Sequence, residues 1–248
     1  MKRVSKPGTK DWEVKTFPTF SGKKAFVLPG AFYGQGVLLM AEAGFNKADN
    51  VEDADVVVFM GGADVDPALY NQKNVASSCH RARDDYEKAI FEKAKELGKV
   101  CFGICRGAQF LHVMNGGVLW QDVNNHAGRD HLIIDLDEDV RVKVTSLHHQ
   151  MLQDNDTLEV LAVTEEQIAT RFEDENLLIN MSQKGNNDSY EVEIEAGCYH
   201  GTKCFFVQGH PEIGSLYYKT WTMSKLHDLM YEWSSSEEVK VMVEGMKI

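Results

Sequence analysis

Cysteines are few in this sequence of 248 residues, and their spacing fits neither a disulfide framework nor a zinc site. There are five, an odd number, and none belongs to a C-x-x-C pair. Free thiols of this kind are typical of a reducing compartment, so we expect a cytoplasmic location. We also expect no metal ion and no cofactor.

Long hydrophobic runs and an excess of basic residues are also missing. No stretch approaches the roughly 20 apolar residues that a membrane helix needs. Residues 1–24 carry seven lysines and arginines without an apolar segment, which does not fit a secretory signal. The formal net charge is -12, whereas nucleic-acid binding requires a basic surface. Neither a membrane nor a nucleic acid is therefore an expected partner.

Short apolar runs alternate with amphipathic segments in the first half, and the first two runs end at proline or glycine. The runs at 25–28, 55–60 and 100–104 predict buried strands, and helices are expected to end near 43 and to span 83–97 and 106–114. This alternation is typical of a parallel sheet with helices on both faces.

The second half has a different pattern. Strands are expected at 132–136, 140–144, 158–163, 190–195 and 204–208, followed by a closing helix at 215–233 and a last short helix. Apolar and acidic residues alternate in 190–195, which predicts one solvated face. We expect an α/β fold with a mostly parallel central sheet and antiparallel strands added in the C-terminal half. An extended arm (1–22) would precede one domain (23–233), and a tail (234–248) would follow.

The first candidate site residue is Cys105, in the segment Gly103-Ile104-Cys105-Arg106-Gly107. A nucleophile between small residues, after a strand and before a helix, is typical of a nucleophile elbow. The turn would present the thiol at the carboxyl edge of the sheet, where ligands bind in parallel sheets. The helix N-terminus would favour the reactive thiolate. For this segment alone, the alternative is a buried structural cysteine.

Two further segments end expected strands. His210-Pro211-Glu212 follows the run 204–207, and its histidine could act as general base, with Glu212 orienting the ring. Gly61-Gly62 follows the run 55–60, and backbone N–H groups at Gly62 and Arg106 could form an oxyanion hole. Taken separately, each segment is better explained as a simple turn.

Together these segments resemble the class I glutamine amidotransferase superfamily over roughly residues 26–229, and most closely its γ-glutamyl hydrolase branch, peptidase family C26. Six segments carry the resemblance: 61–67, 83–84, 103–109, 116–123, 148–150 and 210–212. The resemblance implies a flavodoxin-like three-layer sandwich. It also implies a γ-glutamyl thioester on Cys105, proton transfer by His210 and orientation of that ring by Glu212. Gly61, Gln109 and the backbone around His148 and His149 would hold the glutamyl group.

Three functions are consistent with the resemblance. The first is a free-standing hydrolase of a small γ-glutamyl compound, and the second is a glutaminase that passes ammonia to a separate synthetase. The third is a non-catalytic regulatory member, which the complete triad disfavours. A homodimer is left open, and the leaving amine is not determined.

Two segments do not match the family pattern. The arm and residues 182–188 have no counterpart in it. The polar loop 124–131 is interpreted either as part of the leaving-group pocket or as a plain hydrophilic loop. A metal site at His126 and His131 is not expected, because the carboxylate–histidine spacings resemble no known chelate. Moreover, His148 and His149, if adjacent on a strand, would point to opposite faces.

Overall fold

The computed structural model describes residues 10–11, 17–180 and 191–245, with side chains described for 17–180 and 191–236. The main sheet has the order β1 (Lys10–Asp11), β9 (Val140–Val144), β8 (His131–Asp135), β11 (Glu159–Thr164), β14 (Ile194–Tyr199), β15 (Cys204–Val207), β5 (Val100–Ile104), β4 (Val56–Phe59), β2 (Lys24–Val27) and β3 (Asn46–Lys47). The helices are α1 (Tyr33–Glu42), α2 (Arg81–Glu96), α3 (Arg106–Met114) and α4 (Leu216–Gly245). Two small sheets pair β10 (Met151–Leu152) with β6 (Leu119–Trp120), and β12 (Arg171–Glu173) with both β13 (Leu178–Asn180) and β7 (Asp122–Val123).

The direction of the strands changes at β15. From β3 to β15 every neighbouring pair is parallel, and from β15 to β9 every pair is antiparallel. The expectation of a parallel core with antiparallel strands in the C-terminal half is confirmed. Because β4, β5 and β15 are parallel, their carboxyl ends meet at one edge, and the candidate residues lie there.

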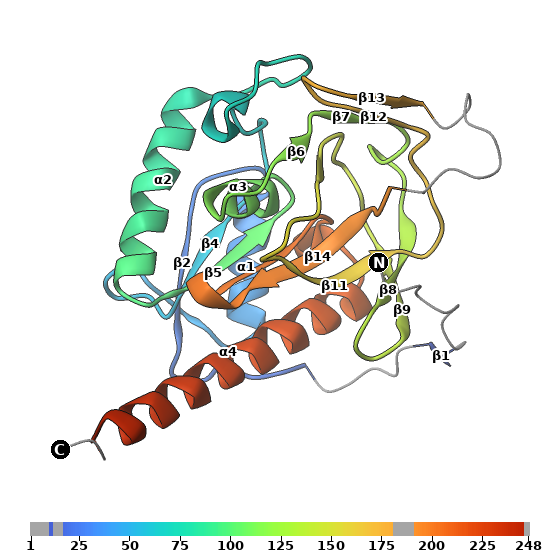
Figure 1. Cartoon of the computed structure of the whole chain (residues 1–248). Helices are drawn as coiled ribbons and strands as arrows, with labels where there is room; N and C mark the ends of the chain where they lie inside the picture. The colour runs from blue at the N-terminus through green and yellow to red at the C-terminus, as the bar shows by residue number, and fades with distance from the viewer. Residues whose placement is uncertain (1–9, 12–16, 181–190, 246–248) are drawn as a thin grey trace.

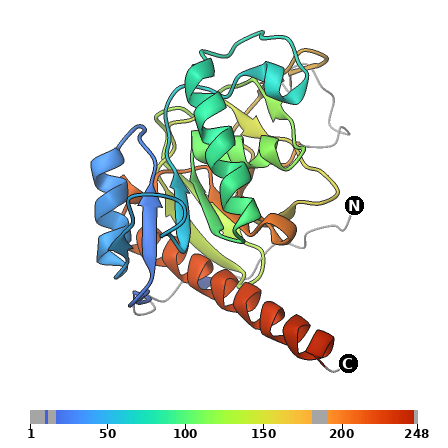
Figure 2. The ribbon, with the colours of Figure 1, turned by 90° about the vertical axis from the view of Figure 1, so that its left-hand side faces the viewer.

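Helices cover both faces of the parallel part, so the domain has three layers (Figure 1 and Figure 2). In β4, Val56 and Val58 belong to the core beneath α1 and α4, whereas Val57 and Phe59 belong to the core beneath α2 and α3. All four side chains are fully buried. A strand buried on both faces has a continuous apolar sequence, which explains the run Val56-Val57-Val58-Phe59.

Two predicted elements differ from the structure. The strand expected at 190–195 is β14, at Ile194–Tyr199, and both of its faces are buried, so the predicted solvated face is wrong. The reason is that other segments cover this face: the N–H groups of Ile168 and Ala169 donate to Glu193, and His126 lies beside Glu195. The closing helix continues to Gly245 without the expected break at 234. Residues 182–188 and most of the arm lie outside the described residues, and the domain division stays a prediction.

No helix in the described ranges combines the length and apolar character needed to cross a membrane.

Candidate active site

Cys105 lies at the turn between β5 and α3, and its backbone there is strained. Its φ of 54° and ψ of -109° are unusual for a residue with a side chain. A methyl group at Gly107 would lie 1.9 Å from the carbonyl oxygen of Phe59, and one at Gly103 would lie 2.7 Å from that of Gly107. Both glycines are therefore required by close backbone packing. The sharp turn predicted from the sequence is confirmed.

His210 follows β15 and lies beside Cys105. Because β15 and β5 are parallel neighbours in register, they end at the same level of the sheet. The His210 ring is buried, and its Nδ1 lies 2.7 Å from Oε1 of Glu212. Burial alone would lower the pKa of His210, but the hydrogen bonds to Cys105 and Glu212 and their charges raise it to about 10. With that pKa, the His210 ring carries a proton near neutral pH beside the Cys105 thiol.

The Gly61-Gly62 loop closes over the same two residues. A methyl group at Gly61 would lie 3.0 Å from Cε1 of His210 and 3.6 Å from Cβ of Cys105. Gly62 has a φ of +138°, which residues with a side chain rarely adopt. The Ala31 N–H donates a 2.9 Å hydrogen bond to the Gly61 carbonyl. Arg106 begins α3, so its N–H is among those without an intrahelical acceptor.

A buried ionic network holds the loop and the elbow in position. Arg83 donates to the Gly61 carbonyl at 3.0 Å and pairs with Glu87 at 2.8 Å. The Arg106 guanidinium, only 1% exposed, pairs with both Glu87 and Asp84. Glu87 therefore bridges the arginine that holds the Gly61-Gly62 loop and the arginine that follows the nucleophile. The sequence indicated Arg83 and Asp84 as a motif, but Glu87 was missed. Its signal was the spacing of four residues from Arg83 on one helix.

The predicted substrate-binding side chains lie in different surroundings. Gln109 is buried and donates to the Gln150 carbonyl at 3.2 Å. His148 is also buried, and its ring points to Glu195 of β14. The contacts of Gln109 and His148 do not test whether either residue binds substrate. For both residues that role stays a prediction.

His149 has different neighbours from His148. Its side chain is 39% exposed and lies between Asp64, in the loop after Gly62, and Asp122. The hydrogen bond to Asp64, opposed by partial burial and supported by Asp122, raises the pKa of His149 to about 9. The two histidines lie in an irregular segment after β9 rather than on a strand, and they point to different neighbours.

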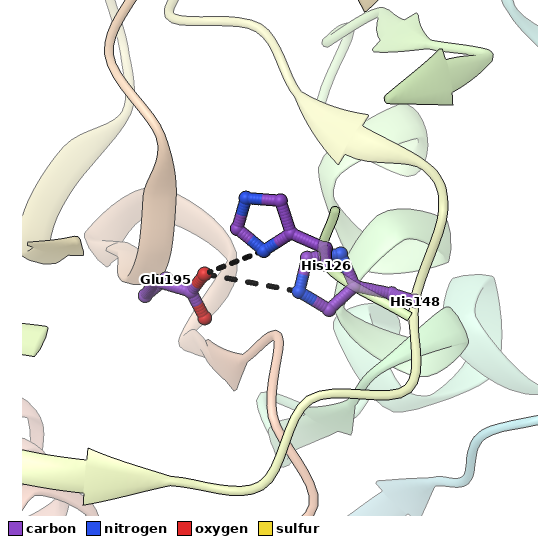
Figure 3. Close-up of side chains that lie close together, drawn as sticks. All are labelled: His126, His148 and Glu195. Atoms are coloured by element: carbon purple, nitrogen blue, oxygen red, sulfur yellow. Dashed lines mark ion pairs between the residues drawn. The ribbon is translucent and has the colours of Figure 1, made fainter. Parts of the chain in front are cut away.

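The loop 124–131 is not a plain hydrophilic loop. His126 is fully buried and His131 is only 9% exposed, and both face Glu195. Figure 3 shows His126 and His148 on one side of the Glu195 carboxylate. The sequence did not indicate this histidine–carboxylate cluster, because its members lie far apart along the chain and Glu195 was expected on a solvated face.

Phe32 is a site residue for which the sequence offered no signal. Its φ of 55° is uncommon for a bulky residue, and its ring packs edge-on against His210 with centroids 5.3 Å apart. Because Phe32 is 37% exposed, it forms part of the surface beside the triad.

A model of the peptidase C26 family matches residues 30–179. The chain belongs to the peptidase C26 family. Among curated proteins, it is 29% identical to a glutamine amidotransferase-like protein of Lactococcus lactis subsp. cremoris, the YvdE homolog, across 44% of this chain and 71% of that protein. It is 26% identical to protein NtpR of Enterococcus hirae, across 46% of this chain and 51% of NtpR. The chain thus spans about half the length of NtpR.

Solved structures show the same fold at low sequence identity. A glutamine amidotransferase from Thermotoga maritima is 14% identical, with a TM-score of 0.52, across 90% of this chain and 94% of that one. PurLQS from the same organism is 14% identical, with a TM-score of 0.56, across 85% of this chain and 98% of that one. These neighbours establish the flavodoxin-like architecture of the C26 chain. The family and its relatives support a hydrolase or amidotransferase type of activity.

Proposed function

We propose that this C26 protein hydrolyses a γ-glutamyl amide bond and releases glutamate and an amine. The observation that carries the proposal is the assembly of Cys105, His210 and Glu212 at one sheet edge of a single chain. The Gly61-Gly62 loop lies against that assembly and is already held by Arg83. All of these contacts lie within one chain.

The chemistry proceeds in two halves. The Cys105 thiolate attacks the γ-carbonyl carbon, and the N–H groups of Gly62 and Arg106 stabilise the resulting oxyanion. His210 gives its proton to the leaving amine, which departs and leaves a γ-glutamyl thioester on Cys105. His210 then takes a proton from water, whose oxygen attacks the thioester. Glutamate leaves, and the thiolate–imidazolium pair is restored. Gln109 and the segment around His148 and His149 hold the glutamyl group.

A second candidate is a glutaminase that delivers ammonia to a separate synthetase. It is favoured by the fold shared with a GMP synthase subunit of Thermoplasma acidophilum, at 13% identity and a TM-score of 0.55 across 88% of this chain and 97% of that one. The lone-chain contacts of the Gly61-Gly62 loop favour the first candidate instead.

A substrate panel distinguishes the two candidates. The purified chain is incubated with glutamine and with several γ-glutamyl amines, and glutamate and ammonia are measured. We expect hydrolysis of at least one γ-glutamyl amine at roughly 1 to 10³ per second. Cys105→Ala should abolish it, whereas Cys79→Ala, at an exposed thiol, should retain it. If every γ-glutamyl amine is inert and glutamine is cleaved only after a cell extract is added, the hydrolase proposal is wrong and the protein is a glutaminase.

A further inference from the structure

The His126–His148–Glu195 cluster is buried and joins three distant segments of the chain. His126 comes from the loop 124–131, His148 from the segment after β9, and Glu195 from β14 (Figure 3). Their exposed fractions are 0%, 3% and 1%. One ligand atom from each residue lies within 4.8 Å of the other two. Burying such polar groups is unfavourable unless each finds a partner.

His148 presents a lone pair to this cluster. Its Nδ1 lies 3.0 Å from the carbonyl oxygen of Gln150 and must donate to it, since a carbonyl only accepts. In a neutral ring this leaves Nε2 without a hydrogen. That Nε2 faces Oε1 of Glu195 at 3.7 Å. Two acceptors therefore point at each other with no hydrogen between them.

His126 has a similar mismatch, because its two ring nitrogens face two carboxylates. Its Nε2 lies 3.3 Å from Oε2 of Glu193, and its Nδ1 lies 3.6 Å from Oε1 of Glu195. A neutral ring has one N–H, so at least one of these nitrogens turns a lone pair toward a carboxylate. Within the described ranges, four of these atoms form no hydrogen bond: both ring nitrogens of His126, Nε2 of His148 and Oε2 of Glu195.

A cation between these atoms would resolve both mismatches. We propose that His126, His148 and Glu195 form a buried site for a divalent transition-metal ion, with Zn²⁺ the best match to two imidazoles and one carboxylate. Ligands about 2.0–2.1 Å from a tetrahedral zinc lie roughly 3.3 Å apart, close to the 3.6 and 3.7 Å separations here. The sequence predicted no metal site, whereas the structure buries Glu195 beside the two histidines, which the sequence did not indicate.

The surrounding contacts are those that orient metal ligands. The Gln150 carbonyl fixes the tautomer of His148, as an acceptor beside a metal-binding imidazole does. His131 also holds the carboxylate, with its Nε2 3.0 Å from Oε1 of Glu195.

The metal would have a structural role near the triad. The segment that carries His148 begins at Thr145, whose carbonyl accepts a 3.0 Å hydrogen bond from the N–H of His210. The backbone carbonyl of Glu195 accepts a 2.7 Å hydrogen bond from the N–H of Gln208, which lies between the end of β15 and His210. An ion that ties His148 to Glu195 would therefore hold the backbone on both sides of the base.

The test measures Zn²⁺ itself, not activity. The full chain, stripped with a chelator and reloaded with ZnCl₂, should bind one Zn²⁺ per chain by elemental analysis and titration. At 100 times its Kd, Zn²⁺ should raise Tm by about 5 to 10 °C. Glu195→Gln and His148→Gln should weaken binding at least about 100-fold and remove the Tm shift. His200→Gln is the matched control, because His200 belongs to a second, partly exposed group with Glu159 and Cys198. It should leave binding unchanged.

A cobalt spectrum decides the matter on the unmodified chain, even if a variant does not fold. Co²⁺ at the proposed site has only nitrogen and oxygen ligands, so its spectrum should lack a thiolate charge-transfer band, and Zn²⁺ should displace it. A thiolate band, or loss of binding in His200→Gln, would place the metal at Cys198 and overturn the proposal. A reloaded chain that binds no metal would also overturn it. Protonated histidines would then be the partners of the Glu195 carboxylate.

Discussion

Cys105 has a backbone conformation that costs about 1–3 kcal/mol for a residue with a side chain. The close packing of Gly103 and Gly107 maintains it, and strain retained in this way often accompanies a functional role. Gly61 lies close to the Cys105 side chain, and the protonated His210 ring supplies a positive charge beside the thiol.

The environment of Cys105 predicts which thiol reacts first. Brief treatment with iodoacetamide should label Cys105 ahead of Cys79, although Cys79 is the exposed one. The reason is that the positive charge of the His210 ring lies beside the Cys105 thiol, whereas slight desolvation and nearby aspartates raise the pKa of Cys79. Peptide mapping by mass spectrometry measures the order. Labelling of Cys79 first would contradict the assignment of the nucleophile.

The pKa of His210 predicts the alkaline limit of activity. With a pKa of about 10 the ring stays protonated, and able to protonate the leaving amine, until the pH rises through that value. The kcat/KM of the γ-glutamyl substrate should therefore decline only near pH 10, because that quantity reports the free enzyme. Glu212→Gln should move the decline to lower pH, since the carboxylate helps to raise this pKa.

His210 and Glu212 should contribute differently to the rate of the reaction. His210→Ala should reduce kcat by several orders of magnitude, and Glu212→Ala by less, because an orienting residue transfers no proton. For the pH profile, a decline of kcat/KM below pH 8 in the unmodified protein would contradict the assignment of His210 as the proton donor. Equal losses in the two alanine variants would indicate that Glu212 is structural.

At the scale of elements, α2 determines where the loop after β4 lies. Arg83, near the start of α2, holds the Gly61 carbonyl, and Glu87 links Arg83 to the first residue of α3. Two loops that approach the nucleophile from different strands are thus joined through one helix.

This connection predicts a loss of turnover without a loss of thiol reactivity. Arg83→Met should lower kcat by about 10² or more, because a misplaced oxyanion donor has that effect. Alkylation of Cys105 should stay near the normal rate, since the triad is untouched. Arg81→Met is the matched control on the same helix, where the side chain is 54% exposed. Similar losses of kcat in both variants would show that the contact to Gly61 does not matter.

The secondary structure was predictable where a pattern was local. The apolar runs that became β4 and β5 lie in the predicted places, because burial on both faces needs a nearly unbroken apolar sequence. The acidic alternation near β14 misled, because a period of two reports two faces but not what covers each of them.

At the scale of the whole molecule, α4 packs across the sheet and joins its parallel and antiparallel parts. Trp221 is 1% exposed and donates from its indole nitrogen to Asp135 of β8 at 2.8 Å. Lys225, one turn later, pairs with the same carboxylate at 2.8 Å. The helix thereby binds to the antiparallel half through a buried polar contact surrounded by apolar core.

Removing this anchor should destabilise the protein. Trp221→Ala should lower the free energy of unfolding by about 3–5 kcal/mol, because it leaves a cavity and takes a partner from buried Asp135. Urea unfolding measures the change. Tyr231→Ala, at an aromatic residue 73% exposed on the same helix, should change it by less than about 0.5 kcal/mol. A Trp221 variant as stable as the Tyr231 variant would contradict the anchoring role of Trp221.

The sequence by itself determined the features that depend on neighbours along the chain. The glycines around Cys105, the glycine pair after β4 and the residues His210-Pro211-Glu212 each define a turn at the end of a strand. Parallel pairing then brings these turns to one edge. Tertiary structure alone decided that Glu87 pairs with Arg106 and that Glu195 lies among histidines. Each is enclosed by residues from distant segments, and the free energy of burying a charge depends on those neighbours in space.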